Sequence, residues 1–416
     1  MTDSATEKRP TWKHPAWRVL AGLILMQAGF TGITVNCMGV LLAAVIADMG
    51  YAASRMALFY TLRALVSAAL VAPLMGVFLR RKSRLLIALM GVIGGLCIAA
   101  GSCFTQLWQW YVAAVFSGAS YSLNNVLVPN IVNNWFAERR GLASAVALSA
   151  SGISGALFSP ILARVIAALG WRSAAVVFGL AILVLTVLPA LFLVRYAPED
   201  CGERPLGERI QPGAGPDRVN DPQEQPAGGG LVFALVTVII MVAYCGTTYT
   251  NQLPLVASSF GFSAMIGATV TSIAMVGNIG SKFLFGALCD RFGVHRAGIG
   301  AMLATALGLL LITFGKHSAV VMYGGTLLFG MVYACATVML SLLCLASFGE
   351  KTYAKPMSRV VALVQIASAF SGPAIAAAYD YTGSFAPALI AGSVCCLLCA
   401  ALLFVLLRMK RQREGA

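Results

Sequence analysis

The chain has 416 residues, of which 59% are hydrophobic and only 11% are charged, and its mean hydropathy is +0.84. This composition excludes an ordinary soluble globular protein and indicates a membrane protein. The net charge of +14 would also suit a nucleic-acid-binding protein. The positions of the 29 Lys and Arg residues distinguish that interpretation from basic loops at a membrane surface.

Apolar runs of about 20 residues follow one another along the chain, and each can cross a hydrocarbon core roughly 30 Å thick. We predict twelve membrane-spanning helices in an all-α membrane protein. They cover residues 17–46, 55–79, 85–104, 108–133, 143–168, 174–194, 231–257, 264–288, 297–315, 319–347, 357–379 and 385–407. Residues 1–16 form a polar, basic tail, and the first apolar run is too long for a signal peptide, so we expect this helix to be retained.

The basic residues gather on one side of these predicted helices. When the connections are assigned alternately to the two sides, the side of the N-terminus holds 23 Lys and Arg residues. The other side holds 3, namely Arg55, Arg172 and Lys316. By the positive-inside rule both termini are cytoplasmic, and no nucleic-acid partner is needed to explain the charge. We expect a monomer in a lipid bilayer, specifically a bacterial inner (plasma) membrane.

The eleven cysteines and three histidines do not predict a chemical site. Most cysteines lie inside apolar helices without regular spacing, so we expect small buried side chains rather than disulfides. His14, His295 and His317 lie at helix edges and far apart, so we predict neither a metal cluster nor a core histidine. No Walker motif is present, and no cofactor is expected.

A polar segment divides the chain into two halves. Residues 196–230 are rich in Pro, Gly and charges and hold 7 of the 15 acidic residues, which predicts a flexible cytoplasmic linker. It joins a six-helix bundle at 17–195 to another at 231–407, followed by a cytoplasmic tail at 408–416. The halves also repeat one another. GVFLRRKSR from Gly76 matches GALCDRFGVHR from Gly286, Ser159-Pro160 matches Gly372-Pro373, and Gly170 and Gly179 match Gly383 and Gly392.

Two parallel six-helix repeats joined by a long loop resemble the major facilitator superfamily over the whole chain. The superfamily signature G-x-x-x-D-R-x-G-x-x-R is complete in the second half, as Gly286, Asp290, Arg291, Gly293 and Arg296. The resemblance implies a conformational gate. We expect Gly286 to allow close helix approach, Asp290 to accept hydrogen bonds from a helix N-terminus, and the arginines to form ion pairs. The alternative is a charged turn, and in the first half Arg80 replaces the acidic residue.

A narrower resemblance begins at Trp135. The run WFAERRGLASAVALSASGISGALFSP is similar to the entry into the fifth helix of the monocarboxylate transporter and oxalate/formate antiporter branch. Arg139 and Arg140, followed by a helix containing Gly152, Gly155 and Pro160, carry this similarity. We assign the two arginines to the gate. The alternative is a basic loop before a tightly packed helix, which is common across the superfamily.

Lys282 is a cation within a predicted span, about 12 Å from Asp290 at 1.5 Å per residue. Snorkelling recovers only part of that depth. Thr271 and Asn278 lie on the same helix face, and a polar stripe that ends in a cation favours a water-filled cavity over lipid. In the similar transporter branch, a basic residue four positions before the glycine holds the substrate carboxylate, which implies a substrate ligand here. The alternative is an interfacial anchor.

Arg63 lies still closer to the middle of its span, and arginine stays charged under all usable conditions. The predicted spans contain no acidic residue away from their ends, so the substrate is the natural counter-anion for Arg63 and Lys282. Whether both contact it together is left open. Arg164 lies nearer an end and is expected to be structural.

Polar and aromatic residues at helical spacing mark the first, fourth, seventh and tenth helices, which line the cavity in the superfamily. They are Gln27, Thr31 and Thr34; Tyr121, Asn124 and Asn125; Tyr244, Thr248 and Asn251; and Tyr333 and Thr337. From this set we assign Tyr121, Asn125, Asn251 and Tyr333 to the substrate site, with Asn278. Packing alone is an equal alternative.

We therefore predict a secondary transporter of small organic anions, mono- or dicarboxylates, that works by alternating access. Coupling is by proton symport or anion exchange, and protons are then a further partner. In proton-coupled relatives an aspartate sits four residues before the basic ligand, whereas here Asn278 cannot titrate. Either a second anion or a proton released by Lys282 then balances the charge. The alternatives are an efflux carrier for amphipathic drugs and, from another class, a membrane-embedded receptor or enzyme.

Overall fold

The computed structural model describes residues 14–81, 84–122, 124–136, 140–206, 230–348 and 354–414, and this part of the chain is almost entirely helical. The helices of the first half are α1 (Ala16–Gln27), the π-helix η2 (Ala28–Cys37), α2 (Met38–Met49), α3 (Ala53–Arg81), α4 (Arg84–Ala100), α5 (Leu107–Ser122), α6 (Asn124–Trp135) and α7 (Arg140–Phe192). Those of the second half are α8 (Gly230–Thr247), α9 (Tyr249–Ser259), α10 (Ala264–Phe292), α11 (Val294–Phe314), α12 (Ala319–Phe329), α13 (Met331–Phe348), α14 (Ala354–Thr382) and α15 (Ala386–Glu414).

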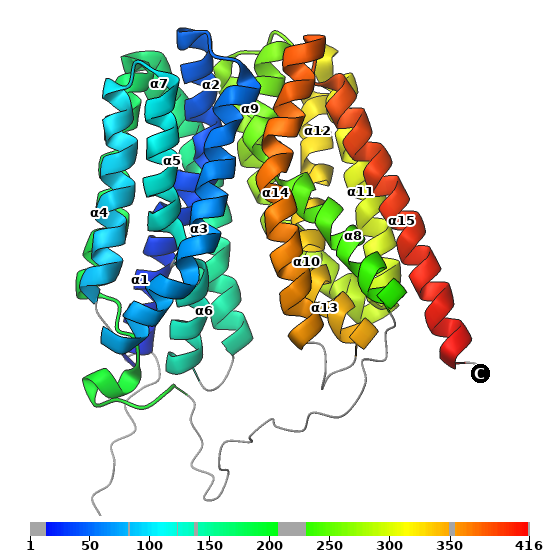
Figure 1. Ribbon diagram of the computed structural model, residues 1–416, viewed down its shortest axis with the longest axis horizontal. Helices are drawn as coiled ribbons and strands as arrows, with labels where there is room; N and C mark the ends of the chain where they lie inside the picture. Colours follow the sequence, from blue (N-terminus) through cyan, green and yellow to red (C-terminus); the bar gives the residue numbers. More distant parts are fainter. Residues whose placement is uncertain are drawn as a thin grey trace, which may run out of the picture.

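These helices form two bundles that lie side by side, each with six membrane-spanning passes (Figure 1). Among the described residues, nine helical segments qualify as spans by length and hydropathy alone. One of them, Val146–Phe192, turns back at Gly170 and is two passes. α3 and the consecutive pair α5 and α6 complete the predicted twelve. The exact residue boundaries of the bundles stay a prediction, and most of the linker lies outside the described residues.

The internal repeat is visible in the backbone at two matched glycines. Gly170 has φ 78° and Gly383 has φ 69°. Both lie in the turn between the last two passes of their bundle, and residues with a Cβ are strained at such angles. A positive φ therefore occurs at the same point of both halves, at two glycines that the sequence repeat matches.

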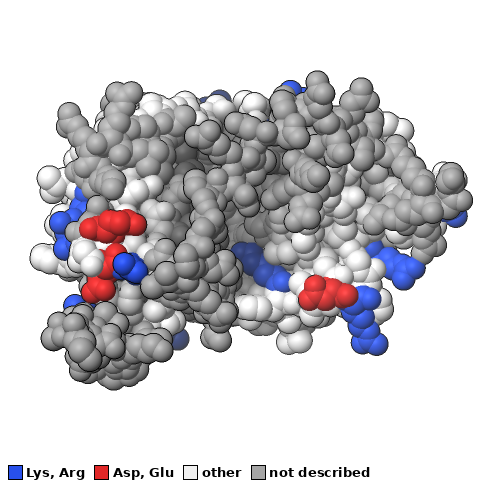
Figure 2. All heavy atoms as spheres, turned by 90° about the horizontal axis from the view of Figure 1, so that it is seen from below, with Lys and Arg blue, Asp and Glu red and all other residues white. Residues whose placement is uncertain are grey.

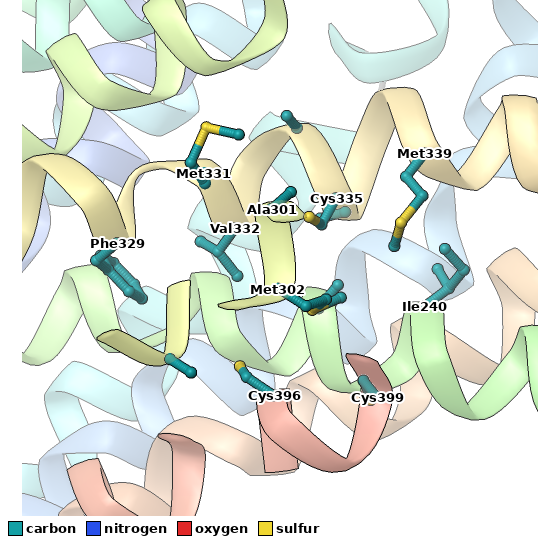
Figure 3. Packing of buried hydrophobic residues seen from close by; sticks show 14 of the residues in the cluster. Ile240, Ala301, Met302, Phe329, Met331, Val332, Cys335, Met339, Cys396 and Cys399 are labelled. Atoms are coloured by element: carbon teal, nitrogen blue, oxygen red, sulfur yellow. The ribbon is translucent and has the colours of Figure 1, made fainter. Parts of the chain in front are cut away.

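Small and sulfur-containing side chains fill the centre of the second bundle. Figure 3 shows Met302, Cys335, Cys396 and Cys399 packed among aliphatic side chains from several helices. All eleven cysteines are free, and the buried ones serve as packing groups, as expected.

One sequence expectation about the core is wrong. His295 is only 7% exposed, although its place at a helix edge suggested an exposed side chain. Gly293, with φ 79°, is the single residue between α10 and α11, so the first turn of α11 folds directly back against the bundle. No cluster of potential metal ligands occurs in the described ranges.

Candidate functional site

The two bundles are hydrogen-bonded together at one end of the molecule. We call the end where α1 begins and α15 finishes the terminal end, and the other the distal end (Figure 1). At the distal end, the Asp380 carboxylate of α14 accepts hydrogen bonds from the backbone N–H groups of Ala53 (3.1 Å) and Ser54 (2.8 Å). These are the first residues of α3 in the other bundle, so Asp380 caps a helix N-terminus across the interface.

Contact between the bundles continues to the middle of α7 and α10. The Ser272 hydroxyl donates to the carbonyl of Ala156 at 2.7 Å. One and two turns further along α10, the helices meet at glycines of α7. A Cβ at Gly155 would lie 3.0 Å from the Met275 side chain, and one at Gly152 would lie 2.9 Å from Ile279. The bundles are therefore in close contact from the distal end as far as Ile279.

Lys282 follows Ile279 by three residues, at the point where this contact ends. Its side chain is half-buried, and no described residue offers its ammonium a hydrogen bond or an ion pair. Between Lys282 and the terminal end, no hydrogen bond joins the two bundles within the described ranges. Lys282 thus lies at the depth where the bundles begin to part.

The polar stripe predicted on α10 is shorter than the sequence indicated. Thr271 is fully buried, and its hydroxyl donates to the carbonyl of Gly267 in the same helix. Asn278 is only 6% exposed, and its Oδ1 atom is buried without a hydrogen-bond partner in the described part of the protein. An unpaired buried acceptor is energetically unfavourable, so Asn278 is the residue of the stripe that most needs a donor from outside the protein.

Arg63 lies in a different environment from Lys282. Its side chain is 7% exposed, and Nη1 donates to the carbonyl oxygen of Thr34 at 2.8 Å. The guanidinium lies 5.4 Å from the ring centre of Tyr60 and 5.9 Å from that of Tyr121. Arg63 therefore has partners inside its own bundle, which the sequence did not reveal.

The partner carbonyl lies in the π-helix η2. Such segments are rare and have i→i+5 in place of i→i+4 backbone hydrogen bonds. Thr34 bonds back five residues through its hydroxyl to Gly29, while its own carbonyl is free to accept from Arg63. The sequence signal for this irregularity is weak, because Gly29 and Gly32 equally suit tight helix packing.

The remaining residues assigned to the substrate site divide into two groups. The Tyr333 hydroxyl donates to Thr250 at 2.9 Å within the second bundle, and the backbone of Asn251 packs closely against Gly39 of α2 on the distal side. The ring of Tyr121 faces the Arg63 guanidinium, whose carbon lies 5.9 Å from the ring centre. Asn125 lies in α6, but its side chain lies outside the described residues.

A second polar group lies beside this region in the first bundle. The Gln27 Oε1 atom accepts hydrogen bonds from Thr31, at 3.1 Å, and from Asn124. Asn124 Oδ1 is buried and unpaired among the described residues. The predicted stripes on the first and fourth helices therefore meet each other.

The residues predicted to form a gate in the second half make no contact across the bundles in the described part of the chain. Asp290 and Arg296 are exposed, Arg291 lies over the ring of Phe292, and no ion pair joins these residues to another described residue. The close helix approach expected at Gly286 is absent, because nothing lies within 4 Å of a Cβ built there. The two bundles are separated at the terminal end (Figure 1), so no helix of the first bundle approaches Gly286 in this conformation. Arg139 and the side chain of Arg140 lie outside the described residues.

Comparison with known families fits this arrangement. The model of the Major Facilitator Superfamily matches residues 23–267 and 233–416. The chain belongs to the major facilitator superfamily. It is thus a membrane transporter rather than an enzyme.

Solved structures of the superfamily share the fold at low sequence identity. A point mutant of the nucleoside transporter NupG aligns with a TM-score of 0.74 at 11% identity and covers 94% of this chain and 99% of that one. The xylose transporter XylE from E. coli, in a partially occluded inward open conformation, aligns with a TM-score of 0.69 at 15% identity over 94% and 97% of the two chains. These likenesses establish the fold alone.

Two curated relatives resemble part of the chain. Monocarboxylate transporter 11 of Homo sapiens is 26% identical over 258 residues, which cover 57% of this chain and 50% of the relative. Monocarboxylate transporter 12 of Mus musculus is 26% identical over 226 residues, which cover 49% and 46%. The chain therefore spans about half the length of the curated relatives it matches, and the resemblance to the monocarboxylate transporter branch is confirmed at this level.

Proposed function

We propose that this transporter moves small organic anions, mono- or dicarboxylates, by alternating access, and that Lys282 binds the carboxylate. The observation that carries the proposal is the position of Lys282. It is a half-buried cation without a partner in the described chain, and it lies where contact between the bundles ends. A cation there lacks a counter-charge unless a ligand supplies one. The partial similarity to monocarboxylate transporters supports the same substrate class.

Other residues complete the proposed site. Asn278 lies one turn before Lys282, and its unpaired oxygen suits a hydroxyl or protonated carboxyl of the substrate rather than the ionised carboxylate, which Lys282 binds. Tyr121, beside Arg63, lies in the first bundle. We assign Arg63 a supporting role, because Thr34 and two tyrosines already hold its guanidinium. Tyr333, which donates to Thr250, and Asn251, which packs against Gly39, are assigned to the periphery of the site.

The orientation is also part of the proposal. Figure 2 looks on to the terminal end and shows Lys and Arg side chains over both bundles. The excess of basic residues supports a cytoplasmic position for this end by the positive-inside rule. The conformation is then open to the cytoplasm and closed outside, with Asp290, Arg291 and Arg296 of the gate released.

An efflux carrier for amphipathic drugs is the second candidate. Cationic drugs favour an acidic residue inside the membrane, and the described acidic residues all lie near helix ends or in connections. Uptake of radiolabelled mono- and dicarboxylates into proteoliposomes, with cationic dyes as the comparison, tests the choice. Carboxylate uptake above empty liposomes supports the proposal, whereas transport of dyes alone contradicts it.

Coupling is tested in the same liposomes. Asn278 cannot titrate, so we expect either exchange against an internal anion or symport in which Lys282 releases a proton. Uptake is measured with and without an internal anion, each with and without an inward proton gradient. Uptake that requires the internal anion indicates exchange, and uptake driven by the gradient alone indicates symport. Gradient-driven uptake that persists in Lys282→Arg but is lost in Asn278→Ala would contradict both mechanisms.

A further inference from the structure

A cavity lies in the second bundle, away from Lys282. It has a volume of about 310 Å³ and is lined by residues of α8, α9, α11, α14 and α15. Its walls include Cys245, Leu309, Ala374, Ala391 and Cys395. For comparison, an apolar cavity of about 150 Å³ is large enough to bind benzene.

The hydroxyl groups that line this cavity all donate hydrogen bonds within the protein. The Tyr249 hydroxyl donates to the carbonyl of Ala388 at 2.6 Å, and the Thr305 hydroxyl donates to that of Ala301 at 2.9 Å. The Ser371 hydroxyl donates to Ser368 at 2.8 Å and lies 2.9 Å from that of Thr248. A water in a cavity needs two to four polar partners, and most of the lining here consists of aliphatic side chains, glycine and cysteine. The cavity therefore suits hydrocarbon.

The cavity opens towards the membrane between α14 and α15. These two helices diverge towards the terminal end, with α8 and α11 visible between them (Figure 1). Lining residues on both helices, Ala374, Ala391 and Cys395, are exposed. The flanking residues Phe370 and Val394 are exposed as well. α15 packs mainly on α11 and α8, so the wedge between α14 and α15 faces away from the first bundle.

The depth of the opening identifies its neighbour. The segment from Ala391 to Cys396 lies about 8 to 15 Å along α15 from Ala386, at 1.5 Å per residue. This is within one leaflet of a hydrocarbon core roughly 30 Å thick, where acyl chains are the surrounding solvent. We propose that this cavity binds an acyl chain of a bilayer lipid from the leaflet at the distal end.

This site adjoins a break in the seventh membrane pass. α8 ends at Thr247 and α9 begins at Tyr249, and the hydroxyls of Thr247 and Thr248 donate back to the carbonyls of Tyr244 and Cys245 at 2.7 Å. The bound chain contacts Cys245 and Tyr249 on either side of this break. The inference rests on the membrane fold and not on the proposed substrate.

Photocrosslinking of the full-length protein in proteoliposomes tests the site. The probe is a phosphatidylethanolamine that carries a diazirine in the middle of one acyl chain. We expect several-fold more adducts on residues 371–375 and 391–396 than on the lipid-facing positions Leu303 and Leu307 of α11. Equal labelling of the cavity and of these positions would overturn the proposal.

A filled cavity provides the matched control. Ala391→Phe places a ring in the cavity and should reduce its adducts about tenfold, because it displaces a few methylene groups. Leu397→Phe adds a ring on the outer face of α15, at an exposed position that neither lines nor flanks the cavity, and should leave them unchanged. Cys395→Phe serves if Ala391→Phe fails to fold. Equal effects of the inner and outer substitutions on the adducts would contradict the proposed acyl-chain site. Loss of the adducts when a trace of a free amphipathic compound is added would also overturn it, because the cavity would then bind a free ligand instead of a bilayer lipid.

Discussion

Lys282 and Arg63 are both cations within membrane-spanning helices, but their surroundings give them different roles. Arg63 is buried, hydrogen-bonded and flanked by tyrosine rings in its own bundle. Lys282 is half-buried and has no partner among the described residues. A charge that is already compensated stabilises the fold, whereas an uncompensated one attracts a ligand.

We therefore expect Lys282→Gln to insert normally and to bind substrate about 10- to 100-fold more weakly, because a hydrogen bond to a charged group is lost. Lys282→Arg should retain part of the affinity. Binding is measured by thermal shift with a panel of carboxylic acids, since a ligand specific for the folded state raises the apparent melting temperature. The control is Lys316→Gln, at an exposed lysine after α11. Normal transport by Lys282→Gln would reduce Lys282 to an interfacial anchor.

Arg63→Met should lower the stability of the protein even without substrate. The change leaves the Thr34 carbonyl of the π-helix without its donor, and the expected cost is about 1 to 3 kcal/mol. The apparent melting temperature in detergent measures it. Arg164→Met removes an exposed arginine from α7 and should change little. An unchanged melting temperature in Arg63→Met, with loss of substrate binding, would instead make Arg63 a direct ligand.

At the scale of the element, the turn between α10 and α11 sets the backbone conformation of the signature segment, residues 286–296. Gly293 provides the positive φ that joins the helices through a single residue, and Asp290 lies exposed just before it. In this conformation Asp290 holds nothing in the described chain. We therefore propose that Asp290 acts as a latch only in the state in which the terminal end is closed.

Asp290→Asn should slow the exchange between the two states several-fold, with little effect on the affinity of a fixed state, because the residue lies at the gate and not beside Lys282. Transport rates at saturating substrate and equilibrium binding separate the two effects. Arg296→Gln should act in the same direction. Wild-type rates in both variants would leave the loop as a charged turn.

At the scale of the whole molecule, a carboxylate at the distal end reaches across the two bundles. Asp380 accepts two backbone hydrogen bonds at the start of α3, and the bundles then remain in contact as far as Ile279. In the proposed alternating-access mechanism, this contact breaks when the terminal end closes.

Asp380→Ala should shift the population towards states open at the distal end by about 2- to 30-fold, the equivalent of losing a helix cap worth roughly 0.5 to 2 kcal/mol. Spin-label distances between the distal ends of α3 and α14 report this shift. The matched control is Asp48→Ala, since Asp48 lies at the same end but bonds to Trp171 and Arg172 within its own bundle. A similar shift in both variants would show a general loss of stability rather than an interbundle latch.

Sequence alone was sufficient for the membrane class, the twelve passes, the repeat and the superfamily. Hydrocarbon forces backbone groups into helices and apolar side chains outwards, so hydropathy and basic loops carry this information locally. The repeat also matched Gly170 to Gly383, and the structure adds that both lie in turns with a positive φ, which favours glycine.

Tertiary structure decided which polar residues are already paired. The sequence placed Arg63 and Lys282 on equal terms, and only packing shows that the π-helix carbonyl of Thr34 accepts from one of them. It likewise decided that Asp380, and not Asp290, caps a helix in this conformation, and that His295 is buried. These contacts join residues far apart in the chain, so their energies depend on how the helices pack and not on the local pattern of residues.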